Sequence, residues 1–421
     1  MLSVFTPTHN PRFLSEAHLS LQGGLFDEWV IVCNNGVNPR DLPQAVLEDP
    51  KVVIIDAPGD IGTNVGALKR YAVERCRGDI LVEFDHDDLM VPTIFGKIRE
   101  AFEDPEVVLA HSNWCEVNNS TWTPRIYSAD YGWRCRTYRH WGHNLLEMKA
   151  PRQCAHTASS MYYGPNHVRA FRRAAYDAVG GYNPDLPIAD DLDLVCRLWM
   201  VGRFRHIDEC GYVYRVHGNN TYLARNADIQ IAAGAMREQY FRAMAESECK
   251  RDGELMLDVG GRFNCPPGYK SVDLQGPADY PYVNLDGVWP FEDNSVGIVR
   301  ASDFLEHLPN KMNTLSEIYR ILRPGGYLLS DTPSTTGPGG EAGQGADQDP
   351  THMSRWNRNA FWYVTKREVA KYIDNTTVRF LPVALRNWFP SDYCRENFIP
   401  YVRADLVAIK GDRPSHGYFE I

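Results

Sequence analysis

Several short apolar runs in the first part of the chain each end in a polar loop, and helix-like segments separate them. The runs cover residues 2–7, 28–33, 51–56 and 80–84, and the loops that follow them include residues 7–10, 34–36, 56–60 and 85–88. Strands that alternate with helices predict a parallel sheet with helices on both faces. Ligands of such sheets bind beyond the carboxyl ends of the strands. We therefore expect these loops to meet at one edge and to form a site for a nucleotide-type ligand.

The fourth loop, Asp85-His86-Asp87-Asp88, places three carboxylates directly after a strand. Carboxylates cannot be buried unpaired at a strand end without a large desolvation cost. A divalent cation of the magnesium or manganese type would hold Asp85 and Asp87 together, because such ions prefer oxygen ligands. The alternative for this stretch by itself is a solvated acidic turn.

The length of 421 residues predicts two or three domains. A net charge of −10 argues against a general polyanion-binding surface. The ten cysteines form no Cys-x-x-Cys pair, so we expect neither a zinc site nor a disulfide framework. The sequence contains no charged segment followed by an apolar leader and no apolar run of about eighteen residues, so we expect a cytoplasmic protein without a transmembrane segment.

The N-terminal half resembles the family 2 glycosyltransferases, which have the GT-A fold. The residues that carry the resemblance are Thr6-Pro7-Thr8-His9-Asn10, Gly78-Asp79 with Phe84-Asp85-His86-Asp87-Asp88, Phe171-Arg172-Arg173, Gly180-Gly181-Tyr182, Asp190-Asp191-Leu192-Asp193-Leu194 with Arg197, and Tyr214-Arg215-Val216-His217. They follow one another in the order of the family's motifs.

The resemblance implies a role for each of several side chains. Asp191 would be the general base that deprotonates an acceptor hydroxyl in an inverting transfer. Asp85, Asp87 and His217 would be ligands of Mn²⁺ or Mg²⁺, with Asp87 the more direct carboxylate ligand. The nucleotide-sugar would be bound by Pro7, Thr8, Asn10, Asn35, Lys69, Asp85, Asp87 and Asp190.

Some of these positions depart from the family or have a simpler explanation. Asn34 and Asn35 stand where the family often has an aspartate, which leaves the nucleobase open because an amide can also bond a base edge. Lys69 could instead belong to a solvated helix face. The acids that begin at Asp190 could simply favour a helix N-terminus. The region 112–167 is rich in aromatic and arginine residues and is interpreted as acceptor-determining, with lid packing or nucleobase stacking as alternatives.

Residues 228–250 predict a helix, and a second strand–helix series begins after it. This part resembles class I methyltransferases that use S-adenosylmethionine, with a Rossmann-like fold. The matching stretches are Pro290-Phe291-Glu292-Asp293-Asn294-Ser295, Leu305-Glu306-His307-Leu308, Leu322-Arg323-Pro324-Gly325-Gly326 and Asp349-Pro350-Thr351-His352.

By this second resemblance, S-adenosylmethionine would contact Asp258, Gly260, Gly261, Asp273 and Asp286. Arg262 occupies the place of the family's second glycine, where the absent side chain normally lets the backbone approach the ligand. An active methyltransferase and a degenerate structural module are therefore both retained as alternatives. His307 and His352 are candidate bases, and the Gly- and Pro-rich segment 332–348 is predicted to be a mobile lid or a flexible loop.

The sequence thus predicts an α/β protein with a GT-A domain at 1–225, a helical linker at 226–252 and a Rossmann-like domain at 253–421. The predicted function is metal-dependent, inverting transfer of a sugar from a nucleotide-sugar, a UDP-sugar by preference, to an acceptor hydroxyl. The second domain would O-methylate the glycan or be degenerate. The first alternative is a methyltransferase recruited to sugars by a GT-A domain that only binds; the second is a binding module whose acidic turn merely carries charge. The acceptor (glycan, lipid, protein or nucleic acid) and the oligomeric state stay open.

Overall fold

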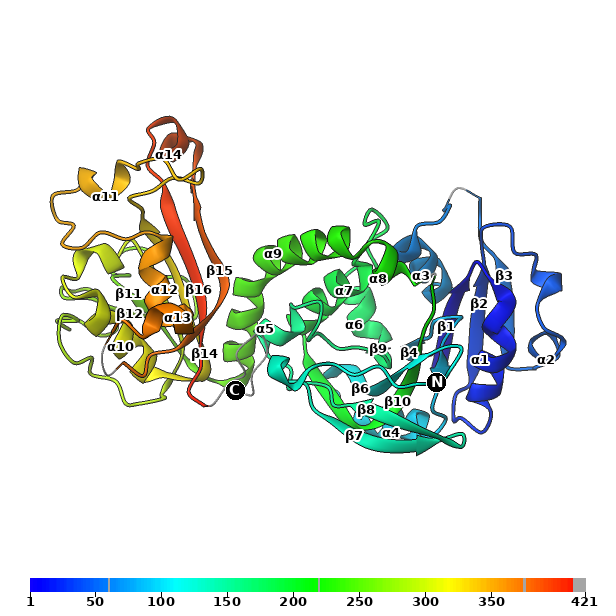
Figure 1. Ribbon diagram of the computed structural model, residues 1–421. Coiled ribbons are helices and arrows are strands. Elements are labelled where there is room, and N and C mark those ends of the chain that lie inside the picture. The colour runs from blue at the N-terminus through cyan, green and yellow to red at the C-terminus, as the bar shows by residue number, and fades with distance from the viewer. Residues whose placement is uncertain (60, 219, 374–375, 412–421) are drawn as a thin grey trace. The chain divides into compact units, whose positions relative to one another are not determined.

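The computed structural model describes residues 1–59, 61–218, 220–373 and 376–411 and divides into two compact α/β units (Figure 1). Unit 1 comprises Met1–Met244 and unit 2 begins at Ala245. The division falls within the long helix α9 (Asn226–Asp252), where the sequence predicts a helical linker. The predicted fold class, two α/β domains, is confirmed. The domain limits stay predictions, and residues 412–421 of the second domain lie outside the described ranges.

Unit 1 is built on one sheet with helices on its faces. Its strands are β1 (Leu2–Thr8), β2 (Glu28–Cys33), β3 (Val52–Asp56), β4 (Ile80–Glu83), β5 (Leu89–Met90), β6 (Val107–Asn118), β7 (Cys135–His140), β8 (His143–Met148), β9 (Arg169–Arg172) and β10 (Arg203–Val216). Its helices are α1 (Leu14–Leu21), α2 (Gln44–Leu47), α3 (Val65–Val73), α4 (Ile94–Ala101), α5 (Ala155–Ala158), α6 (Arg173–Ala178), α7 (Asp190–Trp199), α8 (Thr221–Ala224) and the first part of α9, with 3₁₀ turns η1 (Pro11–Phe13), η2 (Pro39–Asp41) and η3 (Ala129–Tyr131).

The sheet of unit 1 is mixed rather than parallel throughout. Its strand order is β3-β2-β1-β4-β9-β6-β10-β5, and the β7–β8 hairpin joins β6. Strands β1 to β4 are parallel, as predicted. Strand β9 runs antiparallel to both β4 and β6, and β5 runs antiparallel to β10. The parallel prediction is therefore right for β1 to β4. Strands β6 and β10 pair parallel and run in the same direction as β4, because β9 lies antiparallel between β4 and β6. The prediction is wrong for β9, β5 and β8, which run in the opposite direction.

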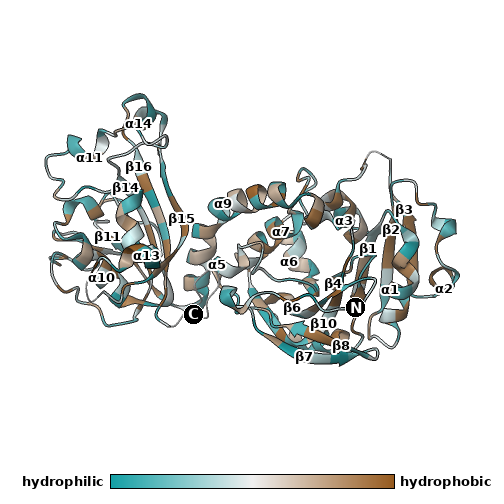
Figure 2. Cartoon of the chain, in the orientation of Figure 1, coloured by the Kyte–Doolittle hydropathy of each residue, from teal (hydrophilic) through white to brown (hydrophobic). Residues whose placement is uncertain are grey.

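Side-chain alternation along β4 separates a hydrophobic face from a charged one. Val82 and Phe84 join a buried cluster with residues of α1 and α4, and the strands of this core are apolar in Figure 2. Glu83 points to the opposite face, where it meets Lys69 of α3. Consequently the last residue of β4, Glu83, is a buried charge shortly before the acidic loop.

Strand β10 returns the chain to the acidic loop. The short strand β5 pairs with β10 through Leu89↔Val213 and Met90↔Tyr212. The Tyr212 hydroxyl accepts a hydrogen bond from the Asp85 amide at 3.2 Å. This pairing fixes the end of β10, and with it His217, beside residues 85–88.

The aromatic region 112–167 is partly core and partly surface. Trp114, on β6, and Trp133 are buried in the main cluster of unit 1, with their rings 5.6 Å apart edge to face. Trp141, at the tip of the β7–β8 hairpin, is 41% exposed. The first two tryptophans thus pack in the core, and the hairpin tip keeps an exposed aromatic ring.

Unit 2 has a second sheet in the order β12-β11-β13-β14-β16-β15. Its strands are β11 (Leu255–Val259), β12 (Lys270–Val272), β13 (Val296–Ser302), β14 (Leu322–Pro333), β15 (Phe380–Trp388) and β16 (Tyr401–Ala408). Its helices are the end of α9, α10 (Lys311–Ile321), α11 (Gly345–Gln348), α12 (Trp362–Thr365), α13 (Arg367–Ala370) and α14 (Asp392–Glu396), with 3₁₀ turns η4 (Leu305–His307) and η5 (Arg358–Phe361).

The first four strands in that order are parallel, and β16 runs antiparallel to both of its neighbours, β14 and β15. Strand β16 lies between β14 and β15. The stretch Leu322 to Gly326, which matches the methyltransferase family, forms the start of β14. Across the ranges that the structure describes, no helix combines the length and the apolarity needed to span a membrane.

Gly78 packs closely against Ser3, near the start of β1. A Cβ atom there would stand 2.5 Å from Ser3 Oγ and 2.7 Å from the Ser3 amide nitrogen. We therefore expect Gly78→Ala to destabilise unit 1 by about 1–3 kcal/mol through overpacking. Gly96→Ala in α4 is the matched control, because its Cβ meets only an ordinary contact at 3.8 Å, and it should be neutral or stabilising by up to about 1 kcal/mol. Urea unfolding followed by circular dichroism compares the two; equal effects would contradict the prediction.

Candidate active site

A buried ion network lies at the end of β4. Lys69 Nζ is 2.6 Å from Glu83 Oε1 and 3.1 Å from Asp190 Oδ2. On the other side of Glu83, Arg169 of β9 donates from Nε to Glu83 Oε2 at 2.8 Å and from Nη1 to Asp191 Oδ2 at 2.8 Å. Lys69 is buried, so a solvated helix face does not describe it. Two cations thus hold three carboxylates that come from β4 and from the start of α7.

The network shifts the pKa values of its acidic side chains in different directions. Burial acts to raise the pKa of Glu83, but Arg169 and Lys69 outweigh it and the pKa is lowered. For Asp191 burial likewise opposes, and Arg169 followed by Lys69 lowers the pKa. For Asp190 burial prevails over Lys69, and with the charge of Asp191 it raises the pKa. Asp191 is therefore the member of the Asp190–Asp191 pair that is held ionised, and its side chain is 27% exposed.

The acidic loop is bound to two histidines and to β10. His217 Nε2 lies 2.8 Å from Asp87 Oδ2, and His167 Nε2 lies 3.3 Å from Asp85 Oδ2. The Arg215 amide donates to Asp88 Oδ1 at 2.7 Å. Burial, with Glu83 and Asp87 nearby, raises the pKa of Asp85 against the opposing His167 and Lys69. Tertiary pairing has therefore brought together Asp87 and His217, which stand far apart in the chain.

The donor chemistry of this edge fits a divalent cation. Carboxylates outnumber the permanently cationic side chains at this edge. The carboxylates are Glu83, Asp85, Asp87, Asp88, Asp190 and Asp191, and the cations are Lys69, Arg169 and Arg215, of which Arg215 also pairs with Glu16. Oxygen and imidazole donors suit manganese-type ions. In the described ranges, however, the one set of three potential ligands whose donor atoms all lie within 4.8 Å of one another is in unit 2. Asp85, Asp87 and His217 would have to move closer to share one ion.

The other residues expected to bind the nucleotide lie on neighbouring strand ends. Pro7 and Thr8 end β1, which pairs with both β2 and β4. The Thr8 hydroxyl donates to the Asn10 carbonyl at 3.2 Å, and the Asn10 side chain caps η1 by accepting from the Arg12 amide at 3.1 Å. Asn35 is exposed in the turn after β2, with φ +53°. These residues share the edge that carries Asp85.

Glu83, His167 and Arg169 belong to this site and were not singled out from the sequence. Glu83 had a detectable signal, because a carboxylate inside a buried parallel strand requires a cation. For His167 and Arg169 the local sequence offers no such signal. Arg169 reaches Glu83 only because β9 pairs antiparallel with β4, where Glu83 is opposite Arg169.

Unit 2 places its predicted cofactor residues along two adjacent strand ends. Gly260 has φ +75° and its amide donates to the Val272 carbonyl at 2.8 Å, which sets Asp273 beside it. A Cβ on Gly261 would lie 2.0 Å from Asp258 Oδ2, so only glycine fits there. Arg300 holds Asp258 Oδ1 at 2.6 Å. This glycine loop next to a carboxylate fits the nucleoside part of S-adenosylmethionine.

Asp286 and Arg262 fit that cofactor less directly. Asp286 is exposed in a turn, and its amide donates to Asn284 Oδ1 at 2.9 Å. Arg262 donates to Gln275 Oε1 at 2.5 Å, and the Gln275 amide in turn donates to Asp273 Oδ1 at 2.9 Å. The guanidinium that replaces the second glycine is thus held next to the turn that carries Asp273.

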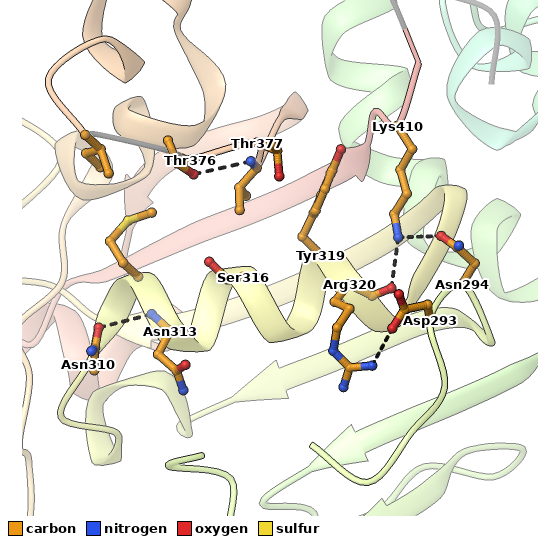
Figure 3. A pocket seen from close by; sticks show the side chains of 13 residues that line it. Asp293, Asn294, Asn310, Asn313, Ser316, Tyr319, Arg320, Thr376, Thr377 and Lys410 are labelled. Atoms are coloured by element: carbon orange, nitrogen blue, oxygen red, sulfur yellow. Dashed lines mark hydrogen bonds and ion pairs between the residues drawn. The ribbon is translucent and has the colours of Figure 1, made fainter. Parts of the chain in front are cut away.

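A cavity of about 610 Å³ lies elsewhere in unit 2, lined by α10, residues 376–378 and Lys410 (Figure 3). Lys410 enters it and donates to Asn294 Oδ1 at 2.6 Å and to the Arg320 carbonyl at 2.9 Å. Burial lowers the pKa of Lys410 to about 8. None of the residues predicted to bind a ligand lines this cavity.

Comparison with known proteins finds matches to methyltransferases and to glycosyltransferases in the same chain. A family model described as a methyltransferase domain matches residues 271–330. The chain is 22% identical to chondroitin synthase of Escherichia coli over 253 residues, which is 59% of this chain and 32% of that protein. It is 32% identical to an uncharacterized methyltransferase of Mycobacteroides abscessus over 102 residues, which is 24% of this chain and 37% of that protein.

Among solved structures, S. aureus TarS 1-349 in complex with UDP-GlcNAc aligns with a TM-score of 0.44 and 12% identity, covering 59% of this chain and 70% of that one. The chain spans about a third or less of the length of the first relatives it matches. Its N-terminal region resembles glycosyltransferases, and a methyltransferase-like region follows in the same chain.

The buried network predicts strong coupling between Lys69 and Glu83. Lys69→Met leaves buried carboxylates without their cation and should destabilise unit 1 by about 3–5 kcal/mol. Lys69→Met combined with Glu83→Gln should cost less than the sum of the two single changes by at least about 1 kcal/mol. Lys97→Met, which removes an exposed pair with Glu100, is the control and should cost at most about 1 kcal/mol. Urea unfolding measures all four variants; additive single effects would contradict the coupling.

Proposed function

We propose that unit 1 is a metal-dependent, inverting glycosyltransferase that moves a sugar from a nucleotide-sugar donor to an acceptor hydroxyl. The observation that carries this proposal is the convergence at one sheet edge of the Asp85–Asp87 loop, His217 and an ionised Asp191. The likeness of the N-terminal region to glycosyltransferases supports the same assignment.

The acidic loop would hold the donor's diphosphate through a divalent ion. Asp85, Asp87 and His217 would be its protein ligands, and the ion, of the Mn²⁺ or Mg²⁺ type, would stabilise charge that develops on the leaving diphosphate. The strand-end residues Thr8 and Asn10 and the exposed Asn35 would bind the nucleoside. We propose a UDP-sugar as donor, and a glycan hydroxyl as acceptor because a relative is named chondroitin synthase.

Asp191 would accept the proton of the acceptor hydroxyl. Its partial exposure leaves it reachable, and its ion pair with Arg169 keeps it ionised at neutral pH. Arg169 Nη2 also lies 3.4 Å from His167 Nε2, and His167 contacts Asp85. Arg169 therefore connects Asp191 to the acidic loop. This link would keep a fixed distance between the proposed base and the loop that would bind the donor.

Unit 2 supports a second proposal, binding of S-adenosylmethionine for O-methylation of the same glycan. The glycine loop at Gly260 and Gly261, with Asp273 beside it, and the match to a methyltransferase model over 271–330 favour it. One alternative is that unit 2 is the working methyltransferase and that unit 1 only binds sugars. A second alternative is that unit 2 is degenerate and binds no cofactor.

Asp191→Asn should lower the sugar transfer rate by about 10²–10⁴-fold, because it removes the proton acceptor with little change in shape. Asp87→Ala should abolish metal-dependent transfer. A coupled assay that detects the released nucleotide, run with Mn²⁺ and a panel of nucleotide-sugars, measures both, and a thermal-shift screen with and without Mn²⁺ selects the donor.

Asp177→Asn, an exposed carboxylate on α6, is the control and should retain full transfer. The thermal unfolding temperature of each variant shows whether the fold is intact. Undiminished transfer by Asp191→Asn would exclude Asp191 as the base, and a metal-independent rate would exclude the role of Asp87.

S-adenosylmethionine should bind the full chain, and Asp273→Ala should weaken that binding while transfer by unit 1 is unaffected. Isothermal titration of the full chain measures this. Arg262→Gly, which restores the family's glycine, should tighten binding if the guanidinium hinders approach to the loop. An absence of heat with all three proteins would identify unit 2 as a degenerate module.

A further inference from the structure

A group of three potential metal ligands lies in unit 2. Glu306 and His307 come from the 3₁₀ turn η4, which follows β13, and His352 comes from the segment after α11. In the part of the chain that the structure describes, they form the one set of three histidine, cysteine or acidic side chains whose donor atoms all lie within 4.8 Å of one another. The group is distinct from the loop that carries Asp85 and Asp87.

Glu306 presents a carboxylate oxygen without a hydrogen-bond partner. Its Oε2 accepts from the Thr332 hydroxyl at 2.6 Å, while its Oε1 is buried and bonds to no group in the described ranges. The side chain is only 2% exposed. An unsatisfied buried carboxylate oxygen is costly, so this atom is available to a ligand.

His352 turns a ring nitrogen toward that oxygen. Its Nδ1 lies 3.0 Å from the Ala346 carbonyl, so Nδ1 carries the proton and donates there. The Nε2 atom then has a free lone pair, and it lies 3.9 Å from Glu306 Oε1, too far for a hydrogen bond. A histidine whose far nitrogen is fixed by a backbone carbonyl is the usual arrangement of a metal ligand.

Main-chain hydrogen bonds hold the two segments that carry these side chains next to each other. The amides of Met353 and Ser354 donate to the Glu306 carbonyl at 2.8 and 2.9 Å. His307 Nδ1 contacts the Thr351 carbonyl at 3.4 Å, and the rings of His307 and His352 lie 5.1 Å apart. The group is therefore tied together by main-chain bonds rather than by hydrogen bonds among its own donor atoms.

A fourth oxygen lies on the open side of the group. Asp349 Oδ1 is used by the Thr351 amide and hydroxyl, at 2.8 and 2.6 Å. Its Oδ2 lies 3.9 Å from His352 Nε2, and its side chain is 48% exposed. Two ligands of one ion with bonds of about 2.1 Å lie roughly 3.0–3.4 Å apart, so the observed 3.9 Å closes with small side-chain rotations.

We propose that Glu306, His307 and His352, with Asp349 as a fourth donor, bind a divalent transition-metal ion of the Zn²⁺, Fe²⁺ or Mn²⁺ class. Two imidazoles and one carboxylate are a ligand set that these ions take with coordination positions left open. The site adjoins the loop predicted to hold S-adenosylmethionine, because Phe304, two residues before Glu306, fills the space next to Gly260. An open position of the ion would there bind an oxygen of water or of an acceptor.

Cobalt binding by the full chain tests the proposal. Because unit 1 is itself proposed to bind a metal, the protein carries Asp87→Ala, is stripped with a chelator and is titrated with Co²⁺ by calorimetry and visible absorption. We expect one equivalent of Co²⁺ whose spectrum lacks thiolate charge-transfer bands, although the chain has ten cysteines. The absence of binding, or a thiolate spectrum, would overturn the site.

Two added substitutions locate the ion. His352→Ala should weaken Co²⁺ binding by about 100-fold or more, since changes to outer-shell partners alone cost about 10- to 100-fold. Glu306→Gln, which keeps an acceptor for Thr332, should weaken it similarly and covers the case in which the alanine variant does not fold. His18→Ala, which removes a histidine that faces Asp49 in unit 1, is the control and should leave binding unchanged. Unaltered affinity in a folded His352 or Glu306 variant would refute the assignment.

Discussion

The burial of Glu83 constrains the whole N-terminal site. A carboxylate at the end of a buried strand requires compensation, and Lys69 and Arg169 supply it from opposite sides. Each cation then has a second carboxylate, Asp190 for Lys69 and Asp191 for Arg169. One buried charge therefore fixes helix α3, strand β9 and the start of α7 relative to the strand that leads into the acidic loop.

The same network orders the chemistry. Arg169 and Lys69 keep Asp191 ionised, whereas Asp190, more buried, has a raised pKa. The acidic loop lies just beyond, bound through Tyr212 and Arg215 to the end of β10. Charge is thus distributed unevenly along one sheet edge, which is consistent with the proposed division between a donor-binding loop and a proton acceptor.

The two units apply one principle in different ways. Both collect polar side chains beyond the carboxyl ends of parallel strands, as open α/β sheets do. In unit 1 the edge is rich in carboxylates held by cations. In unit 2 a glycine loop adjoins Asp273, and the 3₁₀ turn that follows the neighbouring strand β13 carries Glu306 with an unsatisfied oxygen.

The sequence by itself determined the local elements and the order of the motifs, because strand alternation, turn residues and strand-end acids are short-range signals: it located β1 to β4, the helix α9 and the acidic loop. It also indicated Asp191 and His217 by resemblance. Only the tertiary structure decided that β9 enters antiparallel and sets Arg169 opposite Glu83, and that Lys69 is buried rather than solvated. The reason is physical: an ion pair depends on which strands become neighbours, and that pairing joins residues whose separation along the chain leaves no local pattern.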